Sequence, residues 1–289
     1  MLMNMKDLLS VANDQNFAVP AFNIGTGQIL KAVIECCEEK QAPVILAIHP
    51  LELDFQGDHF VAGCIAAANK SKVPMVIHLD HGSEIGQIQR AIRDGFTSVM
   101  IDASHMSFEE NIEITKKVVA MAHPLNISVE AELGTIGTTG TGGEYGAEKI
   151  VYTDPAKAKE FVEKTGVDTL AIAIGTAHGI YPKGVKPELK LDLLREIKAL
   201  VSIPLVLHGG SSNPDEEIAE SVRRGVNKIN ISSDIKAAFY KQCRKTLDEN
   251  PNTYEPFAVY PESIQAMKEV INFKIDLFND ADKMKYYRL

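Results

Sequence analysis

Short apolar runs alternate with helical patterns along most of the chain, and this alternation constrains the fold more than any other feature. Eight runs are rich in β-branched and other apolar residues, as strands buried on both faces are. They cover residues 17–22, 44–48, 74–82, 98–101, 128–133, 169–174, 205–207 and 228–231. Strands that alternate with amphipathic helices at nearly regular spacing form parallel sheets. The sequence therefore predicts an α/β fold, a parallel (β/α)8 TIM barrel, with an open doubly wound sheet as the alternative.

The length of the chain agrees with one such barrel. Barrels of this type commonly occupy about 250 residues. This chain has 289 residues, and we expect a single domain over residues 1–289. Two segments interrupt the regular spacing. Residues 134–146 are rich in glycine and form a candidate lid, and residues 234–249 and 264–275 predict an extra C-terminal helical segment, packed outside the barrel or on a partner subunit.

Charge and composition exclude several classes of function. Asp and Glu outnumber Lys and Arg by 39 to 30, so the chain lacks the basic surface with which nucleic-acid-binding proteins neutralise phosphates. No apolar segment is long enough to span a bilayer. The four cysteines show no metal-ligand spacing, and the first residues lack the apolar core of a signal peptide. We expect a cytoplasmic protein that binds small molecules, and neither nucleic acid nor membranes.

Three of the predicted strands are followed by a histidine and then a glycine. The pairs are His81-Gly82, His178-Gly179 and His208-Gly209. At a glycine frequency of about 7%, the histidines of this chain would give about half of one such pair by chance. In a barrel the carboxyl ends of the strands form one rim, and three imidazoles there supply the protein ligands of a catalytic zinc with its fourth position open. The alternative is that each histidine caps a strand end by hydrogen bonding, but their equivalent positions favour the metal.

Other ionisable residues fall on the same predicted rim. Asp80, Asp102 and Glu132 stand at or near the ends of the third, fourth and fifth predicted strands. The histidines without a strand and a glycine beside them are predicted to be surface or packing residues, and they are His49, His59, His105 and His123. His78 is predicted to lie in the barrel wall.

Two loops on this rim have the composition of a phosphate site. The seventh predicted strand leads to His208-Gly209-Gly210-Ser211-Ser212, and the eighth leads to Asn230-Ile231-Ser232-Ser233-Asp234. Barrels often hold phosphate in these two loops, with backbone N–H groups, hydroxyls and a helix N-terminus. Serines before a helix also serve as plain N-caps. Beside a metal rim, phosphate binding is the better interpretation.

Six motifs resemble those of one enzyme family. They are Pro20-Ala21-Phe22-Asn23, His78-Leu79-Asp80-His81-Gly82, Glu130-Ala131-Glu132-Leu133-Gly134, Gly175-Thr176-Ala177-His178-Gly179, Leu205-Val206-Leu207-His208-Gly209 and Asn230-Ile231-Ser232-Ser233-Asp234. With them the chain resembles, over nearly its whole length, the class II (zinc-dependent) ketose-bisphosphate aldolases, which include fructose- and tagatose-bisphosphate aldolases. The resemblance implies a lyase that reversibly cleaves a ketose 1-phosphate or 1,6-bisphosphate to dihydroxyacetone phosphate and an aldehyde such as glyceraldehyde 3-phosphate.

The resemblance also implies a role for each residue of the rim. Asp80 would be the catalytic acid or base, since cleavage needs the proton of the C4 hydroxyl removed beside a Lewis acid. The implied ligands of Zn²⁺ are His81, His178 and His208, while Asp102 and Glu132 would touch a second position for a divalent or a monovalent cation. The implied substrate-binding residues are Asn23, Gly179, Gly209, Gly210, Ser211, Asn230, Ile231, Ser232 and Ser233. We also expect a homodimer or homotetramer.

Two motifs depart from the family pattern. The family's lid usually has Gly-Gly-x-Glu-Asp, whereas this chain has Gly142-Gly143-Glu144-Tyr145. Glu144 is a candidate for proton exchange with the enediolate, with a solvated loop glutamate as the alternative. In the tail, relatives have Asp/Glu-Pro-Arg and use that arginine, across a subunit interface, for the distal phosphate of the substrate. This chain has Glu255-Pro256-Phe257, so we expect a substrate for which the distal phosphate matters little.

Two other functions remain open beside the aldolase. A three-histidine zinc rim also activates water, so one alternative is a zinc-dependent hydrolase of a sugar phosphate. The other is a sugar-phosphate binding protein without catalysis, which would leave the carboxylate of Asp80 unexplained. A small-molecule sugar phosphate is the expected ligand in all three cases.

Overall fold

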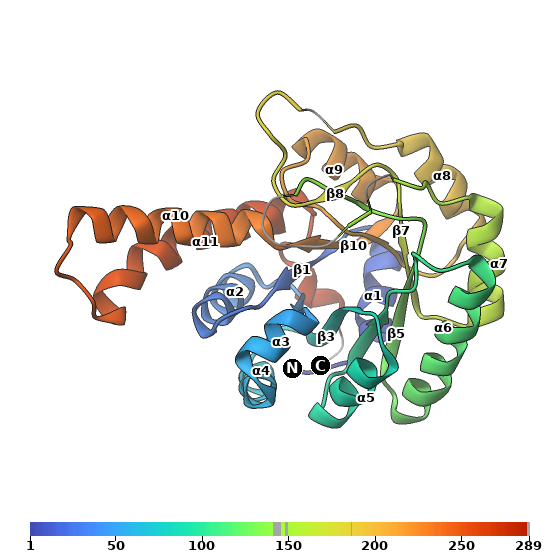
Figure 1. Ribbon diagram of the computed structural model, residues 1–289, viewed down its shortest axis with the longest axis horizontal. Coiled ribbons are helices and arrows are strands. Elements are labelled where there is room, and N and C mark those ends of the chain that lie inside the picture. The colour runs from blue at the N-terminus through green and yellow to red at the C-terminus, as the bar shows by residue number, and fades with distance from the viewer. Residues whose placement is uncertain (141–145, 148–149, 186, 288–289) are drawn as a thin grey trace.

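A closed, parallel barrel of eight strands forms the centre of the molecule (Figure 1), in a computed structural model that describes residues 1–140, 146–147, 150–185 and 187–287. The barrel strands are β1 Val19–Asn23, β2 Val44–Ile48, β3 Met75–Gly82, β4 Ser98–Ile101, β5 Ser128–Leu133, β7 Thr169–Ile172, β9 Leu205–Leu207 and β10 Val226–Ile231. Around the barrel their order is β1-β10-β9-β7-β5-β4-β3-β2, and β1 pairs with both β2 and β10. The predicted (β/α)8 barrel is confirmed, and the open sheet is excluded.

Helices surround the barrel, as the alternating pattern predicted (Figure 1). They are α1 Met5–Gln15, α2 Gly27–Lys40, α3 Pro50–Gln56, α4 Asp58–Lys70, α5 Ile85–Asp94, α6 Phe108–Ala122, α7 Pro155–Thr165, α8 Leu191–Leu200, α9 Asp215–Arg223, α10 Ser233–Glu249 and α11 Pro256–Leu277, with 3-10 turns at η1 His123–Leu125 and η2 Lys283–Tyr286. α2 is typical: Thr26 caps its first turn, and its buried residues recur every three or four positions, so one face packs on the sheet. Within the described ranges, no helix is long and apolar enough to cross a membrane.

The helix α1 closes the amino end of the barrel and was not predicted. Asn4 caps it, and its apolar residues recur at helical spacing. Met5, Leu8 and Leu9 are fully buried against inward-facing residues near the beginnings of the strands, such as Val19. The amino end is therefore filled with apolar side chains, and polar chemistry is left to the opposite, carboxyl end.

The helices α10 and α11 form an antiparallel hairpin, here called the arm, that projects from one side of the barrel (Figure 1). α11 also packs on α2, which joins the arm to the barrel. α11 begins earlier than the predicted 264–275, because Pro256 fits the first turn of a helix and Pro261, inside the helix, obscured the pattern. Tyr254 and Phe257 are 83% and 78% exposed near the end of the arm. The extra C-terminal helical segment is confirmed, while its contact with a partner subunit stays a prediction.

Asp280, which follows α11, is a fully buried carboxyl group. Its exposed fraction is 0%, and neither of its carboxyl oxygens has a hydrogen-bond partner within the described part of the chain. Burial raises the pKa of Asp280 well above its usual value. The folded protein therefore keeps a proton that the unfolded chain loses at about pH 4. The contribution of Asp280 to the free energy of unfolding therefore falls as the pH rises from about 4 toward the folded-state pKa.

The variant Asp280→Asn should lack this pH dependence. Relative to the wild type, we expect its free energy of unfolding to increase between about pH 4.5 and about pH 7.5, by about 1.4 kcal/mol for each pH unit below the folded-state pKa. Urea unfolding at both pH values measures the difference. Asp282→Asn, at an exposed neighbouring position, is the matched control and should follow the wild type. Parallel pH profiles for the wild type and Asp280→Asn would contradict the prediction.

Candidate active site

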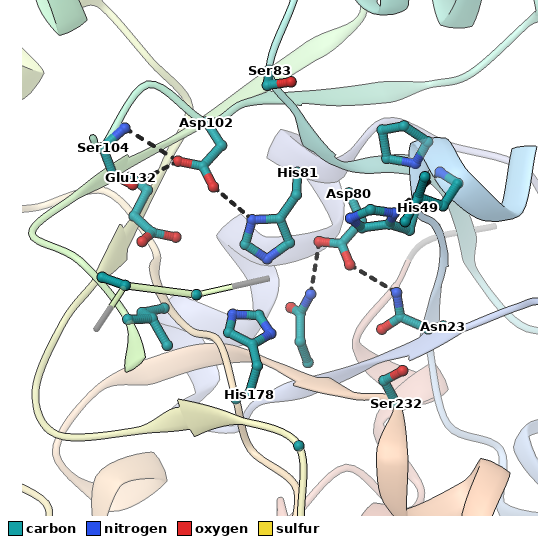
Figure 2. A pocket seen from close by; sticks show the side chains of 18 of the residues that line it. Asn23, His49, Asp80, His81, Ser83, Asp102, Ser104, Glu132, His178 and Ser232 are labelled. Carbon is teal, nitrogen blue, oxygen red and sulfur yellow. Dashed lines mark hydrogen bonds and ion pairs between the residues drawn. The ribbon is translucent and has the colours of Figure 1, made fainter. Parts of the chain in front are cut away.

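A bulge at the end of β3 brings two ionisable side chains to the same cavity. β3 pairs with β4 at Leu79 and Val99 and next at Gly82 and Ile101, so β3 carries one extra residue. His81 has a φ of 51°, in the left-handed region that non-glycine residues rarely adopt. Regular strand alternation would point Asp80 and His81 to opposite faces. With the bulge, both side chains line the cavity (Figure 2).

The three histidines of the predicted rim converge. Nε2 of His81 lies 2.8 Å from Nδ1 of His208, and the ring centroids of His81 and His178 are 5.0 Å apart. One ligand atom from each of the three lies within 4.8 Å of the other two. His178 belongs to β8 Ala177–His178, which pairs with β6 Gly137–Thr138 beyond the barrel strands. Three separate segments therefore place their imidazoles around one point.

Two of these imidazoles contact a carboxylate through the ring nitrogen that does not face the other histidines. Nδ1 of His81 lies 2.8 Å from Oδ2 of Asp102, whose Oδ1 accepts hydrogen bonds from Ser104 (Figure 2). Nε2 of His208 lies 2.8 Å from Oε1 of Glu130. An ionised carboxylate only accepts hydrogen bonds, so each imidazole donates to its carboxylate and turns its second nitrogen toward the other histidines. This is the arrangement in which histidines bind metals.

Burial and neighbouring charges shift the pKa values of this group. Burial and the nearby charge of His81 lower the pKa of His208 to about 4, so its imidazole is neutral, the form that binds metals. Burial alone would lower the pKa of His81, but Asp80 and Asp102 raise it to about 10. A metal ion that binds Nε2 of His81 must therefore displace a proton.

A second group of possible ligands adjoins the histidines. His81, Asp102 and Glu132 also have ligand atoms within 4.8 Å of one another. Oε2 of Glu132 is buried and has no hydrogen-bond partner among the described residues, and burial, followed by the charge of Asp102, raises its pKa well above the usual value. A buried carboxylate oxygen without a donor is where a cation fits. The donor set of three imidazoles and two carboxylates therefore suits a divalent metal such as zinc.

Asp80 lies beside this cluster and is fixed by two amides. The side chain of Asn23 donates to Oδ2 at 2.8 Å, and that of Asn230 donates to Oδ1 at 2.9 Å. Burial alone would raise the pKa of Asp80, but nearby positive charge, first that of His81 and then that of Lys228, outweighs it and holds the pKa well below its usual value. Asp80 is therefore an ionised carboxylate with a fixed orientation, and in this form its oxygens accept hydrogen bonds and can take a proton from a hydroxyl placed against them.

Comparison with known proteins agrees with this geometry. The family model of class II fructose-bisphosphate aldolases matches residues 3–283. The chain belongs to this family. It is 35% identical to the YdjI aldolase from Escherichia coli K12, whose crystal structure matches with a TM-score of 0.85 over 98% of this chain and 100% of that one.

Two further crystal structures are similar. A candidate fructose-1,6-bisphosphate aldolase from Coccidioides immitis is 30% identical, with a TM-score of 0.86 over 98% of this chain and 99% of that one. Fructose-bisphosphate aldolase from Campylobacter jejuni, at 23% identity, shares the fold, with a TM-score of 0.82 over 98% of this chain and 97% of that one. The protein is thus a class II aldolase, a carbon-carbon lyase.

The cavity of this aldolase has a volume of about 620 Å³ at the carboxyl end of the barrel. The predicted site residues that line it are Asn23, Asp80, His81, Asp102, Glu132, His178, Gly179, Gly209, Ser211, Asn230 and Ser232. Four others are buried and do not line it, namely His208, Gly210, Ile231 and Ser233. Glu144 lies outside the described residues.

The two predicted phosphate loops meet at the N-terminus of α10. Oγ of Ser211 lies 3.4 Å from the backbone nitrogens of Ser232 and Asp234. Oγ of Ser232 is buried and has no hydrogen-bond partner among the described residues. Gly209 has a φ of +64°, and a Cβ there would lie 2.8 Å from the carbonyl oxygen of Ala177. Close packing of the loops thus brings the serines Ser211 and Ser232 to the lining of the cavity at a helix N-terminus, a place where anions bind.

Two of the histidines predicted to be surface or packing residues also line the cavity, namely His49 and His105. Nδ1 of His49 accepts from the backbone N–H of Leu51 at the start of α3, and its ring centroid is 6.2 Å from that of His81. The sequence did contain a signal that His49 lies at the carboxyl end of the barrel. It stands between the second strand and Pro50, and a proline favours the first position of a helix. The interaction between Lys236 and Glu52, with Nζ 2.6 Å from Oε1, is a further part of the lining that the sequence did not indicate.

Proposed function

We propose that this aldolase reversibly cleaves a ketose 1-phosphate, of the fructose or tagatose type, to dihydroxyacetone phosphate and an aldehyde, with zinc as its metal. The observation that carries the proposal is the position of Asp80, an ionised carboxylate fixed by two amides beside three converging imidazoles. The adjacent loops at the N-terminus of α10 support a phosphate on the substrate.

The residues of the site suit each part of this reaction. His81, His178 and His208 would hold the zinc, and bound zinc supplies a Lewis acid that favours negative charge on the ketone end of the substrate. Asp80 takes the proton of the C4 hydroxyl. The C4 oxygen becomes the carbonyl of the aldehyde, the C3–C4 bond breaks, and its electron pair stays on the three-carbon fragment as an enediolate. Protonation at C3 then gives dihydroxyacetone phosphate, a step for which Glu144 stays a prediction.

The amide and hydroxyl groups of the two loops would orient the substrate. Gly209, Ser211 and Ser232 line the cavity next to the histidines, so a phosphate there would place the reacting carbons beside Asp80. Asp102 and Glu132 would hold a second cation near the same substrate. Closure of the site against water would protect the enediolate.

A turnover screen tests the proposal. Zinc-loaded protein is incubated with a panel of ketose 1-phosphates and 1,6-bisphosphates that differ in configuration at C4, and dihydroxyacetone phosphate is detected with a coupled enzyme. We expect its release from at least one ketose. Inorganic phosphate without dihydroxyacetone phosphate would instead support the hydrolase. Binding of ketose phosphates without turnover would support a binding protein.

The distal phosphate of the substrate should matter little to this aldolase. Phe257 stands where relatives have an arginine, and it is 78% exposed on the arm. A charge-assisted contact to phosphate contributes about 1.5 to 3 kcal/mol, or one to two orders of magnitude. We therefore expect kcat/KM for ketose 1-phosphates to equal or exceed that for matched bisphosphates, and Phe257→Arg to shift the preference toward bisphosphates.

The control for this prediction is Tyr254→Arg, which adds the same charge at an exposed position nearby. It should leave the preference unchanged. A bisphosphate preference above about a hundredfold in the wild type exceeds what one such contact supplies and would show a complete distal phosphate site. The exposed aromatic residues of the arm also support the proposed homodimer or homotetramer, which light scattering in solution measures directly.

A further inference from the structure

Below the three histidines, the barrel interior contains a buried charged layer. Lys228 from β10, Glu130 from β5 and His78 from β3 are each 0% exposed. Nζ of Lys228 lies 2.8 Å from both carboxyl oxygens of Glu130 and 3.5 Å from Nε2 of His78. His78, predicted to lie in the barrel wall, instead lies in this layer, with its Nδ1 2.9 Å from Oγ of Ser98.

Stability alone does not explain such a layer. Removing two charges from water has a cost that their mutual attraction repays only partly, and apolar residues of similar volume are often equally stable or more so. The amino end of this same barrel is filled with apolar side chains such as Leu8 and Val19. The charges lie on the side toward the histidines, where Glu130 contacts His208.

We propose that Lys228 is a positioning residue, which holds Glu130 by both carboxyl oxygens so that Glu130 fixes the ring of His208 with Nδ1 toward the metal position. The inference rests on the proposed zinc site. Lys228 does not line the cavity, so it acts through Glu130 and not on the substrate. Glu130 receives two contacts from Lys228, one from His208 and a longer one, at 3.4 Å, from the hydroxyl of Thr169. The two short contacts from Lys228 reach both carboxyl oxygens, so they fix the orientation of Glu130 and, through it, the rotation of the imidazole.

The support of His208 differs from that of His81. The side chain of Asp102, which supports His81, is 21% exposed and is held by the neutral donors of Ser104. Water can therefore replace a lost contact there. Glu130 and Lys228 are fully buried, so water does not replace the lysine when it is removed, and only the neutral hydroxyl of Thr169, 3.4 Å from Oε2, remains beside that oxygen as a hydrogen-bond donor. Loss of Lys228 should disturb metal binding although the lysine is not a ligand.

The test measures zinc affinity rather than catalysis. Lys228→Met removes the charge and keeps a long side chain. The metal-free variant is titrated with zinc in competition with a chromophoric chelator, and the visible spectrum of its cobalt form is recorded. We expect zinc affinity to fall about 10- to 100-fold, as for other residues that orient metal ligands, and the cobalt spectrum to change because one ligand is no longer fixed.

The control is Lys198→Met, which removes a partly buried lysine that contacts Asn13, away from the cavity. Its zinc affinity and cobalt spectrum should match the wild type. If Lys228→Met does not fold, the double variant Lys228→Met with Glu130→Gln leaves no unpaired charge. This double variant should fold, and its zinc affinity should still be about tenfold or more below that of the wild type. The reason is that both contacts that orient the side chain at position 130 are lost.

Wild-type affinity together with an unchanged cobalt spectrum, in either variant, would overturn the inference. This outcome is distinct from failure of the proposed function. A wild-type protein that binds zinc but cleaves no ketose phosphate would refute the function, whereas the comparison of affinities between wild type and Lys228→Met would still decide the role of the lysine.

Discussion

Asp80→Ala should keep its zinc and lose catalysis. Neither group of possible metal ligands includes Asp80, so the metal content, measured by atomic absorption, should equal that of the wild type. Turnover should fall about 100- to 10,000-fold, the usual effect of removing a general acid or base. The carboxylate is the only group that we assign to accept the C4 hydroxyl proton, which is why the expected loss is large.

Asn23→Ala gives a graded comparison for this prediction. It removes one of the two amides that fix Asp80 and leaves the carboxylate in place. Its loss of turnover should be clearly smaller than that of Asp80→Ala. An Asp80→Ala variant that loses zinc, or that cleaves ketose phosphates at the wild-type rate, would show that the proton is taken by a different carboxylate.

Removal of the metal should abolish turnover completely. The three imidazoles converge on one point, and the zinc that they would hold supplies the Lewis acid for the charge that develops on the substrate. Dialysis against a strong chelator should therefore stop cleavage, and added zinc should restore it. In His178→Ala, which lacks one of the three ligands, zinc should restore little activity.

The matched control is His59→Ala, which removes an exposed histidine on α4. It should respond to chelator and zinc as the wild type does. Full activity of His178→Ala after exhaustive chelation would contradict both the metal and its assignment to the three histidines.

The sequence predicted the barrel because its strands are short, apolar and separated by regular helical patterns. This periodicity is local, so it is visible without the structure. α1 shows the same signals, an N-cap at Asn4 and apolar residues at helical spacing, and could have been predicted. The start of α11 was harder, since Pro261 inside a helix is uncommon.

The site was predicted by residue type but not by geometry. Strand alternation alone separates Asp80 from His81, and only the bulge with its positive φ at His81 brings them together. The position of His178 depends on β8, a two-residue strand too short to be recognised from periodicity. Lys228 was not singled out, because the reach from β10 to Glu130 on β5 is a long-range contact that local patterns do not contain.

The apolar plug formed by α1 at the amino end has a consequence for exchange kinetics. With that end filled, the cavity of the described structure opens at the carboxyl end, so sugar and metal share one entrance. A bound ketose phosphate would lie between the histidines and solvent. The metal would then have to enter before the substrate and leave after it. Saturating substrate would therefore lengthen the residence time of zinc simply by covering it.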